Sequence, residues 1–194
     1  LPTTSPTTAE PSTEDHDVIP MNTPARQSLP SHFCLRPMPG KGLGVIALKP
    51  IAQGEFVGEY KGEVMSKEVK DRRYLPSLRD EQTEEDREWI QSRLDRDQTL
   101  TGCYLYGIDD VPPTNNGQTA SRIYVDAEDE YHSLWTRFIN HASLPFTNVH
   151  PKIIHESYDG NPRVCFLANR NIKEGDEICI DYGDDYWLEG DDVF

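Results

Sequence analysis

The sequence is poor in basic residues for its acidic content. Its 194 residues include 19 Lys and Arg against 34 Asp and Glu, which gives a formal net charge of −15. This excess of negative charge disfavours direct contact with nucleic-acid phosphates and favours a basic partner, although any soluble acidic surface would give the same composition. We therefore expect no direct nucleic-acid binding, and a Lys/Arg-rich peptide is the candidate partner.

Several other signals are missing. The four cysteines, Cys34, Cys103, Cys165 and Cys179, form no C-x-x-C pair, so the usual zinc-ligand spacing is absent. We expect these thiols to be reduced and mostly buried, because nothing else in the sequence indicates secretion. No apolar run approaches membrane-spanning length, so we expect no membrane partner. The chain starts without a signal-peptide pattern and looks like a piece of a longer protein.

The two ends of the chain have the composition of tails. Residues 1–31 are rich in Pro, Thr, Ser and acids, and eight of the fifteen prolines precede residue 40. Such a segment buries too little apolar surface to offset its ordering entropy. We expect a disordered or linker-like tail over 1–31, with part of 18–31 packed on a domain that starts near His32. Residues 189–194 are expected to form a short acidic tail.

Most of the remaining chain reads as short strands. Apolar or alternating runs at 45–48, 103–108, 122–126, 164–168 and 177–182 are typical of strands, and 109–121 has the composition of a loop. The segment 55–64 mixes β-forming residues with glycines, which predicts a twisted hairpin. Many short strands with one helical insert favour a mostly β (α+β) domain over an alternating βαβ sheet.

The helical insert is predicted over residues 66–100. This stretch is crowded with charges, and Pro76 divides it into two helical pieces. Thr83 is placed to cap the second helix, with Asp86 as its capping-box partner. Trp89, Ile90 and Leu94 would give that helix a narrow apolar face.

Four segments carry residue types found in ligand sites. The two glycines of KGLG at 41–44 let backbone amides approach a ligand closely, although a Gly-rich hairpin turn gives the same pattern. RFINH at 137–141 brings an amide and an imidazole into one turn, where they can bind an amino-acid head group or an adenine edge, or serve as structural turn residues. The segments 103–106 and 177–183 are aromatic strands, and Tyr182 ends the second one just before a glycine.

In this order, these segments resemble the SET-domain family of protein lysine methyltransferases. The match runs through KGLGVIA, GEFVGEYKGEV, YLYGID, IYVDA, RFINHA and VCFLANRNIKEGDEICIDYGDDYW, and it covers residues 32–188. The ending YGDDYWL is also similar to that of a small viral SET protein that methylates histone H3. The resemblance implies small β-sheets whose C-terminal strand threads through a preceding loop as a pseudoknot, with 66–100 as an inserted helical region.

The resemblance also implies an activity and a set of site residues. The enzyme would transfer methyl from S-adenosylmethionine to a protein lysine and release S-adenosylhomocysteine. Tyr182 matches the catalytic tyrosine. Tyr104 matches an aromatic residue that lines the lysine channel and helps Tyr182 to orient the lysine amine. Ile180 stands at a channel position that influences the number of methyls, and its aliphatic side chain favours more than one. The residues that match cofactor-binding positions are Lys41, Gly42, Leu43, Arg137, Asn140, His141 and Trp187.

The sequence departs from the family pattern at several points, one of which is Ser133, where a glycine is common. The family motif N-H-S-C-x-P-N starts here at Asn140, has Ser143 at the cysteine position, and reaches its last asparagine, Asn148, two residues late. No Cys-rich segment follows Trp187 or precedes the domain. The resemblance therefore implies no zinc, and another segment would have to close the channel; the acidic tail is one candidate.

The identity of the substrate stays open at this point. The last fourteen residues carry six acids and no base, which favours a basic peptide such as a histone tail and, with it, a nuclear location. Alternatives are methylation of a non-histone basic protein, or a SET module that binds peptide without catalysis. The presence of Tyr182, Asn140 and His141 favours an enzyme. The sequence does not indicate an oligomeric state.

Overall fold

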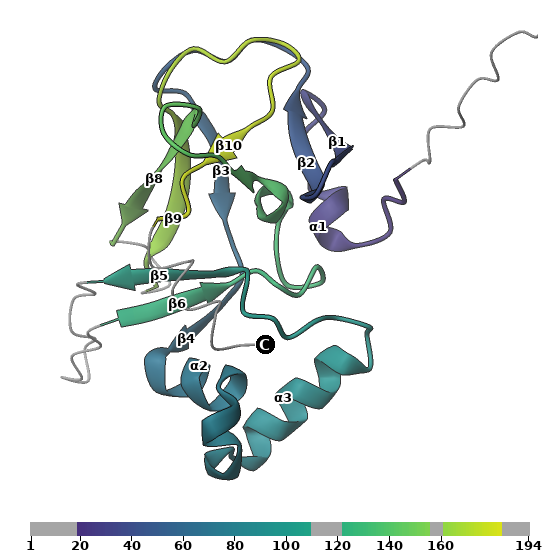
Figure 1. The fold of residues 1–194 in the computed structure, drawn as a ribbon, viewed down its shortest axis with the longest axis vertical. Helices are drawn as coiled ribbons and strands as arrows, with labels where there is room; N and C mark the ends of the chain where they lie inside the picture. Colours follow the sequence, from purple (N-terminus) through teal and green to yellow (C-terminus); the bar gives the residue numbers. More distant parts are fainter. Residues whose placement is uncertain (1–18, 110–121, 156–160, 184–194) are drawn as a thin grey trace, which may run out of the picture.

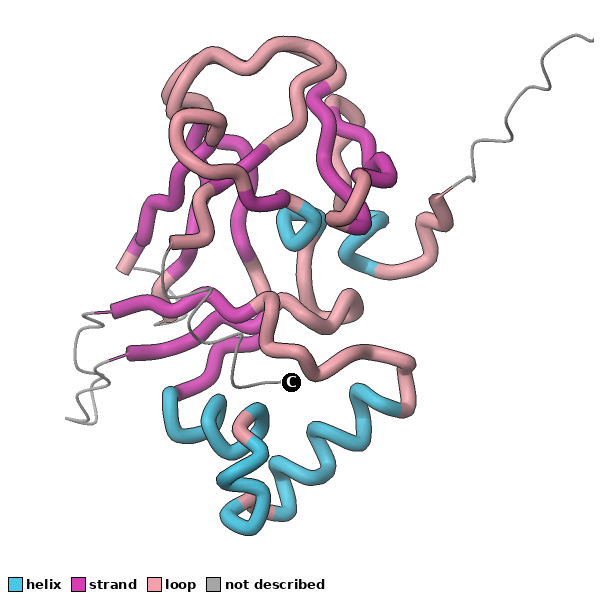
Figure 2. The backbone as a smooth tube through the Cα atoms, viewed as in Figure 1, coloured by secondary structure: helices cyan, strands magenta, loops and turns pink. Residues whose placement is uncertain are grey.

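The computed structural model describes residues 19–109, 122–155 and 161–183. It consists of small sheets with one helical insert, which confirms the predicted mostly β (α+β) fold. Figure 2 shows the helices of the insert gathered at one end of the molecule. The elements in chain order are α1 (Pro24–Gln27), β1 (Phe33–Met38), β2 (Gly42–Ala47), β3 (Phe56–Tyr60), β4 (Glu63–Ser66), α2 (Lys67–Tyr74), the 3-10 helix η1 (Pro76–Glu81), α3 (Glu84–Leu94), β5 (Leu105–Asp109), β6 (Arg122–Asp126), the 3-10 helix η2 (Trp135–Phe138), β7 (Asn140–His141), β8 (Val149–Ile154), β9 (Arg163–Ala168) and β10 (Cys179–Ile180).

The described strands form four sheets, ordered β1-β2, β3-β9-β8, β4-β6-β5 and β10-β7. The β4-β6-β5 sheet lies between the insert and the other strands (Figure 1). The hairpin predicted over 55–64 is wrong: β3 pairs with β9, whereas β4 pairs with β6. The chain changes sheets at Gly62 instead of reversing there. A Cβ at Gly62 would lie 2.0 Å from the Asp126 carbonyl oxygen, so only glycine fits this crossing.

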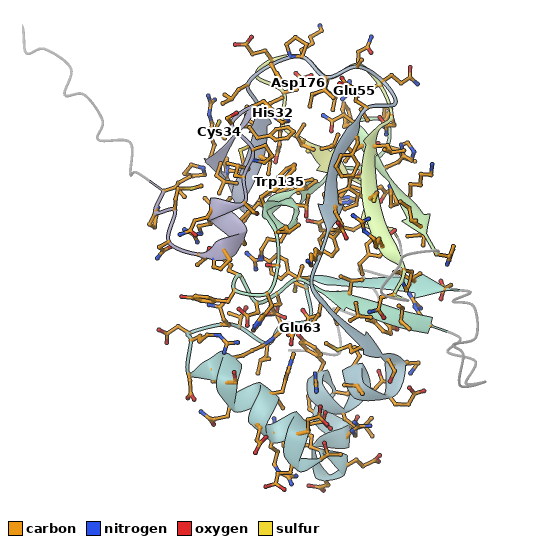
Figure 3. The ribbon with its side chains drawn as sticks, turned by 180° about the vertical axis from the view of Figure 1, so that it is seen from behind. His32, Cys34, Glu55, Glu63, Trp135 and Asp176 are labelled. Atoms are coloured by element: carbon orange, nitrogen blue, oxygen red, sulfur yellow. The ribbon has the colours of Figure 1, made fainter. Side chains whose placement is uncertain are left out.

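The main core lies among the sheets on the far side of β4-β6-β5 from the insert. Val45, Val164 and Ile178 are fully buried there. Trp135 lies in the interior next to the β1-β2 hairpin (Figure 3), with its ring 4.7 Å from that of Phe33. Each buried side chain of this size stabilises the fold by about 1.5–3 kcal/mol, so this core is the main source of stability.

The packed structure begins before His32, the start suggested by composition. Thr23 caps α1, and Pro24 stands in its first turn, where a missing N–H costs nothing. Ala25 is 0% exposed, and its N–H donates to the Glu130 carbonyl at 3.0 Å. Part of the segment 18–31 is therefore packed on the domain, beside η2 (Figure 1).

The insert follows the predicted outline. Pro76 separates α2 from α3, and both bonds of the capping box are present: the Asp86 N–H donates to Thr83 Oγ1 and the Thr83 N–H donates to Asp86 Oδ2, each at 3.1 Å. The predicted apolar face is wrong at Leu94, which is 49% exposed. The face of α3 that packs inward instead buries charged residues, because ion pairs are available to satisfy them.

Two buried charged residues hold the insert in place: Asp86 links its helices α2 and α3, and Arg93 links α3 to the β4-β6-β5 sheet. Asp86 accepts from Arg72 Nε at 2.7 Å and from Arg73 Nε at 2.9 Å. Arg93, only 1% exposed, pairs with Asp126 at 3.0 Å and with Glu63, and its guanidinium covers the Trp89 ring at 3.9 Å. Figure 3 shows Glu63 at the junction between the sheet and the helices. None of the helices in the described ranges is long and apolar enough to cross a membrane.

We expect Asp86→Asn to lower the free energy of unfolding at neutral pH by about 3 kcal/mol, because it leaves two arginines without their carboxylate. Burial alone would raise the pKa of Asp86, but the bonds from Arg72, Thr83 and Arg73 outweigh it and hold that pKa below its usual value. The stabilisation is therefore full above the unfolded pKa of about 3.9 and is lost as the pH falls through the lower folded value.

Urea unfolding of the wild type and of Asp86→Asn between pH 7 and pH 2.5 measures this dependence. The difference between the two proteins should stay constant down to about pH 4 and shrink below it. Glu88→Gln, which changes an exposed acid of the same helix, is the matched control and should cost little at any pH. A difference that does not change with pH would contradict the ion-pair assignment.

Candidate active site

The C-terminal strand β10 crosses the chain near Asn140 and is held from both sides. On one side it pairs in parallel with β7, so that Cys179 is opposite Asn140 and Ile180 is opposite His141. On the other side Asn148, 2% exposed, donates from Nδ2 to the Glu177 carbonyl at 2.7 Å and accepts the Cys179 N–H at 2.8 Å. This is the strand arrangement that the resemblance implies, and Asn148 closes it despite its shifted position in the motif.

Gly44, the second glycine of the segment 41–44, lies in close contact with other parts of the same chain. A Cβ at Gly44 would lie 2.9 Å from both Asn140 Nδ2 and Glu177 Oε1, and 2.5 Å from Met38 Cγ. The second glycine thus lets side chains of this same chain approach β2, rather than leaving room for a ligand. Asn140 Nδ2 uses that space to donate to the Leu43 carbonyl at 3.2 Å and to Glu177 at 2.9 Å. Gly42 has a φ of +71° and an open surface.

Tyr182 follows β10 and meets His141 directly. Its N–H donates to His141 Nδ1 at 3.2 Å, which puts the proton of a neutral imidazole on Nε2, and the two ring centroids are 5.4 Å apart. The Tyr182 hydroxyl donates to the Ile139 carbonyl at 2.8 Å. A hydroxyl oxygen has two lone pairs, so it can accept a hydrogen bond as well as donate one. The structure therefore brings together the three residues Asn140, His141 and Tyr182 from two distant segments.

A group of aromatic side chains lies next to Tyr182. The Tyr60 hydroxyl donates to the Tyr104 carbonyl at 2.7 Å, and the Tyr60 ring centroid is 5.9 Å from that of Tyr106. Burial raises the pKa of Tyr60 well above its usual value, and the neighbouring Tyr182 adds to the shift. Tyr60 therefore stays protonated. Sequence reasoning missed Tyr60 as a site residue, although it lies in the EYKGEV segment that carried part of the resemblance.

The Arg137 guanidinium stacks on the ring of Tyr104. The guanidinium carbon is 4.2 Å from the Tyr104 ring centroid. Its Nε donates to the Ala127 carbonyl at 2.8 Å and Nη2 donates to the Glu128 carbonyl at 2.9 Å, while the residue is 8% exposed. The predicted role of Arg137 in cofactor binding stays a prediction, and the observed contacts support Tyr104.

A cavity of about 350 Å³ is lined in part by Ala142, the residue that follows His141 in the chain. Lys41 Nζ donates to the His141 carbonyl at 3.1 Å at one edge. Phe146 is 71% exposed, and Arg170 Nη2 fixes its loop by donating to the Phe146 carbonyl at 3.3 Å. Burial raises the pKa of the Cys179 thiol in the cavity wall to about 12, so it stays protonated. The lining residues are Lys41, Ala142, Phe146, Asn148, Arg170, Asp176, Glu177 and Cys179.

Some predicted features cannot be placed. Trp187, the predicted adenine-packing residue, the acidic tail and most of the loop 109–121 lie outside the described residues. Within the described ranges, no group of three or more His, Cys, Asp or Glu side chains is arranged to hold a metal ion.

Comparisons with known proteins identify the family of this chain. The SET domain family matches residues 42–183. The chain is 32% identical over 146 residues to the N-lysine methyltransferase KMT5A-A of Danio rerio, and these residues make up 75% of this chain and 33% of that protein. It is 28% identical over 151 residues to the histone-lysine N-methyltransferase SUV39H1 of Xenopus laevis, and these residues make up 77% of this chain and 29% of that protein.

A solved structure shares the fold. The crystal structure of CpSET8 from Cryptosporidium matches with a TM-score of 0.50 at 24% identity, over 78% of this chain and 57% of that chain. The chain belongs to the SET-domain family, as the sequence resemblance indicated. It spans about a third of the length of the curated relatives described above.

We expect Gly44→Ala to lower the free energy of unfolding by about 3 kcal/mol, because the added methyl must displace Asn140 and Glu177 in a packed region. Gly175→Ala is the matched control. Gly175 has a φ of +88° with nothing near its Cβ position, so it should cost only the backbone strain of about 1 kcal/mol. Chemical denaturation of both variants measures the difference, and equal losses would contradict a close approach at Gly44.

Proposed function

We propose that this chain is an S-adenosylmethionine-dependent protein lysine N-methyltransferase that acts on a basic peptide such as a histone tail. The observation that carries the proposal is the contact of Tyr182 with His141, with Asn140 opposite Cys179 on the paired strands and an aromatic cluster next to Tyr182. The relatives named as lysine and histone-lysine methyltransferases support the same reaction. A nuclear location goes with a histone substrate.

The residues around the cavity fit the cofactor. S-adenosylmethionine, when bound, supplies a methyl group on an electrophilic sulfonium. The His141 carbonyl and the exposed Phe146 ring suit an adenine, which needs a hydrogen-bond acceptor for its amino group and a flat apolar face. Gly42 is exposed on the strand β2, and Leu43, which follows it, is partly exposed. Lys41 would have to release the His141 carbonyl or share it.

The aromatic cluster suits a lysine side chain. A free lysine amine has a pKa of about 10.4 and must lose its proton before it attacks a methyl group. Walls made by Tyr60, Tyr106 and Tyr182 disfavour the charged form by desolvation and so lower that pKa. Tyr182 can accept a hydrogen bond from the amine, because its own proton is already donated to Ile139. This orients the nitrogen lone pair for an in-line displacement.

The channel wall bears on the number of methyl groups. Ile180 is 4% exposed and lies two residues before Tyr182. Its side chain has no hydroxyl to hold a water or the amine in one orientation, so it favours addition of more than one methyl group. The net charge of −15 favours basic peptides. A non-histone basic protein would satisfy the same chemistry, whereas a non-catalytic module is disfavoured by the intact Tyr182 junction.

We expect label from S-adenosylmethionine to transfer to a core histone, alone or in nucleosomes, and Tyr182→Phe to lower the rate by about 100-fold or more. Tyr131→Phe, which removes the hydroxyl of a tyrosine that is 44% exposed, is the matched control and should keep the wild-type rate. Mass spectrometry of the product gives the lysine and the number of methyl groups. Bound cofactor without label on any histone would contradict the histone proposal, and equal rates for Tyr182→Phe and wild type would contradict the role of Tyr182.

Phe146→Ala should weaken binding of S-adenosylhomocysteine about fivefold to tenfold, because it removes one aromatic face of about 1 kcal/mol or slightly more. Leu144→Ala is the matched control: Leu144 is in the same loop and is also 71% exposed, but it does not line the cavity. Isothermal titration calorimetry measures both affinities. A loss of the same size in the two variants would mean that the loop, rather than the Phe146 ring, determines affinity.

A further inference from the structure

A short segment before the family match binds a carboxylate next to the candidate site. Thr23 and Arg26 lie outside residues 42–183. The Thr23 hydroxyl donates to Glu130 Oε2 at 2.6 Å, and Arg26 donates from Nε to Oε2 at 2.8 Å and from Nη2 to Oε1 at 3.1 Å. This two-pronged geometry is the strongest form of an arginine–carboxylate contact. The side chains of Arg26 and Glu130 are only 19% and 14% exposed, so the contact is shielded from solvent.

Glu130 also forms an ion pair with Arg137. Its Oε1 lies 3.3 Å from Arg137 Nη1, and the Arg137 side chain is 6% exposed. Burial alone would raise the pKa of Glu130, but the hydrogen bonds from Arg26 and Thr23 outweigh it and hold that pKa below its usual value. The carboxylate is therefore charged at neutral pH and shared between two guanidinium groups. Phe138 adds a second link, because its ring lies within 5.9 Å of Arg26 Cζ and 5.0 Å of Arg137 Cζ.

Arg137 in turn holds Tyr104. Its guanidinium covers the Tyr104 ring at 4.2 Å, which gains a cation–π attraction in a site shielded from water. The Tyr104 carbonyl accepts from the Tyr60 hydroxyl at 2.7 Å and from the Ala127 N–H at 3.1 Å. Arg137 therefore holds the ring of Tyr104, and the bonds from Tyr60 and Ala127 hold its backbone.

We propose that Arg26 and Glu130 are positioning residues for Tyr104, and that the segment 23–26 is part of the support of the active site. This rests on the proposed function and on the place in the lysine channel that the family resemblance gives to Tyr104. Without Arg26, the Glu130 carboxylate would draw Arg137 closer as its remaining cation, and the guanidinium would turn away from the Tyr104 ring. The segment would then affect the rate of methyl transfer as well as stability.

A double-mutant cycle on the full chain tests the link. We expect Arg26→Met to lower kcat about threefold to tenfold in the wild-type background, and less than twofold when Tyr104→Leu is already present, since residues that act through one another are not additive. Arg26→Lys should recover part of the loss. Arg72→Met, which removes a guanidinium of similar exposure from a carboxylate of the insert, should lower the melting temperature without changing kcat well below it. Equal losses in both backgrounds would overturn the proposal.

A second measurement does not depend on activity. In an NMR spectrum of protein with ¹³C-labelled tyrosine rings, the Tyr104 signal is the one that disappears in Tyr104→Phe. It should shift in Arg26→Met and in Glu130→Gln, but not in Arg72→Met. An unshifted signal would overturn the proposal. A shifted signal in a protein that transfers no methyl group would support the link and overturn the proposed function instead.

Discussion

Four acidic side chains within residues 126–130 hold the described parts of this molecule together. Asp126 pairs with Arg93 of the insert, and Glu130 pairs with Arg26 of the N-terminal segment. Glu128 accepts from the Thr101 N–H at 2.6 Å and from the Gly102 N–H at 2.9 Å, just before Tyr104. Asp126, Glu128 and Asp129 are each no more than 1% exposed. Carboxylates at this depth are tolerated only when they are paired, so every element that reaches them is held in a defined place.

The buried acids and their partners explain how a mostly β domain with small sheets holds the residues of the candidate active site in place. No single sheet carries the candidate residues; Asn140 and His141 come from β7, Tyr182 follows β10, and Tyr60 ends β3. Their relative positions depend on the strand crossing closed by Asn148 and on the Arg137 guanidinium, which donates to the Ala127 carbonyl and covers the Tyr104 ring. Such polar support is geometrically more exacting than apolar packing, because each hydrogen bond fixes a direction as well as a distance. A site that must align a nucleophile benefits from it.

Local sequence patterns predicted the elements well and their partners poorly. The capping box of Thr83 and Asp86, the break at Pro76 and most of the strand runs depend on neighbouring residues, so they are visible in the sequence. The assumed hairpin at 55–64 failed because strand pairing depends on which distant strand offers a complementary edge. The prediction that Leu94 is buried was wrong for a similar reason. Arg93 is buried instead, and its partners Glu63 and Asp126 lie about thirty residues away on either side.

The sequence by itself determined the fold class, the insert and, through its ordered motifs, the family and the candidate roles of Asn140, His141 and Tyr182. The tertiary structure alone decided that Tyr60 donates to the Tyr104 carbonyl in the candidate site, that Arg137 stacks on the Tyr104 ring, and that Arg26 reaches Glu130 across 104 positions of the chain. The physical reason is the same in each case. Propensity, capping and hydrophobic period are local properties, whereas a buried charge or hydroxyl is explained only by the partner that the complete fold brings to it.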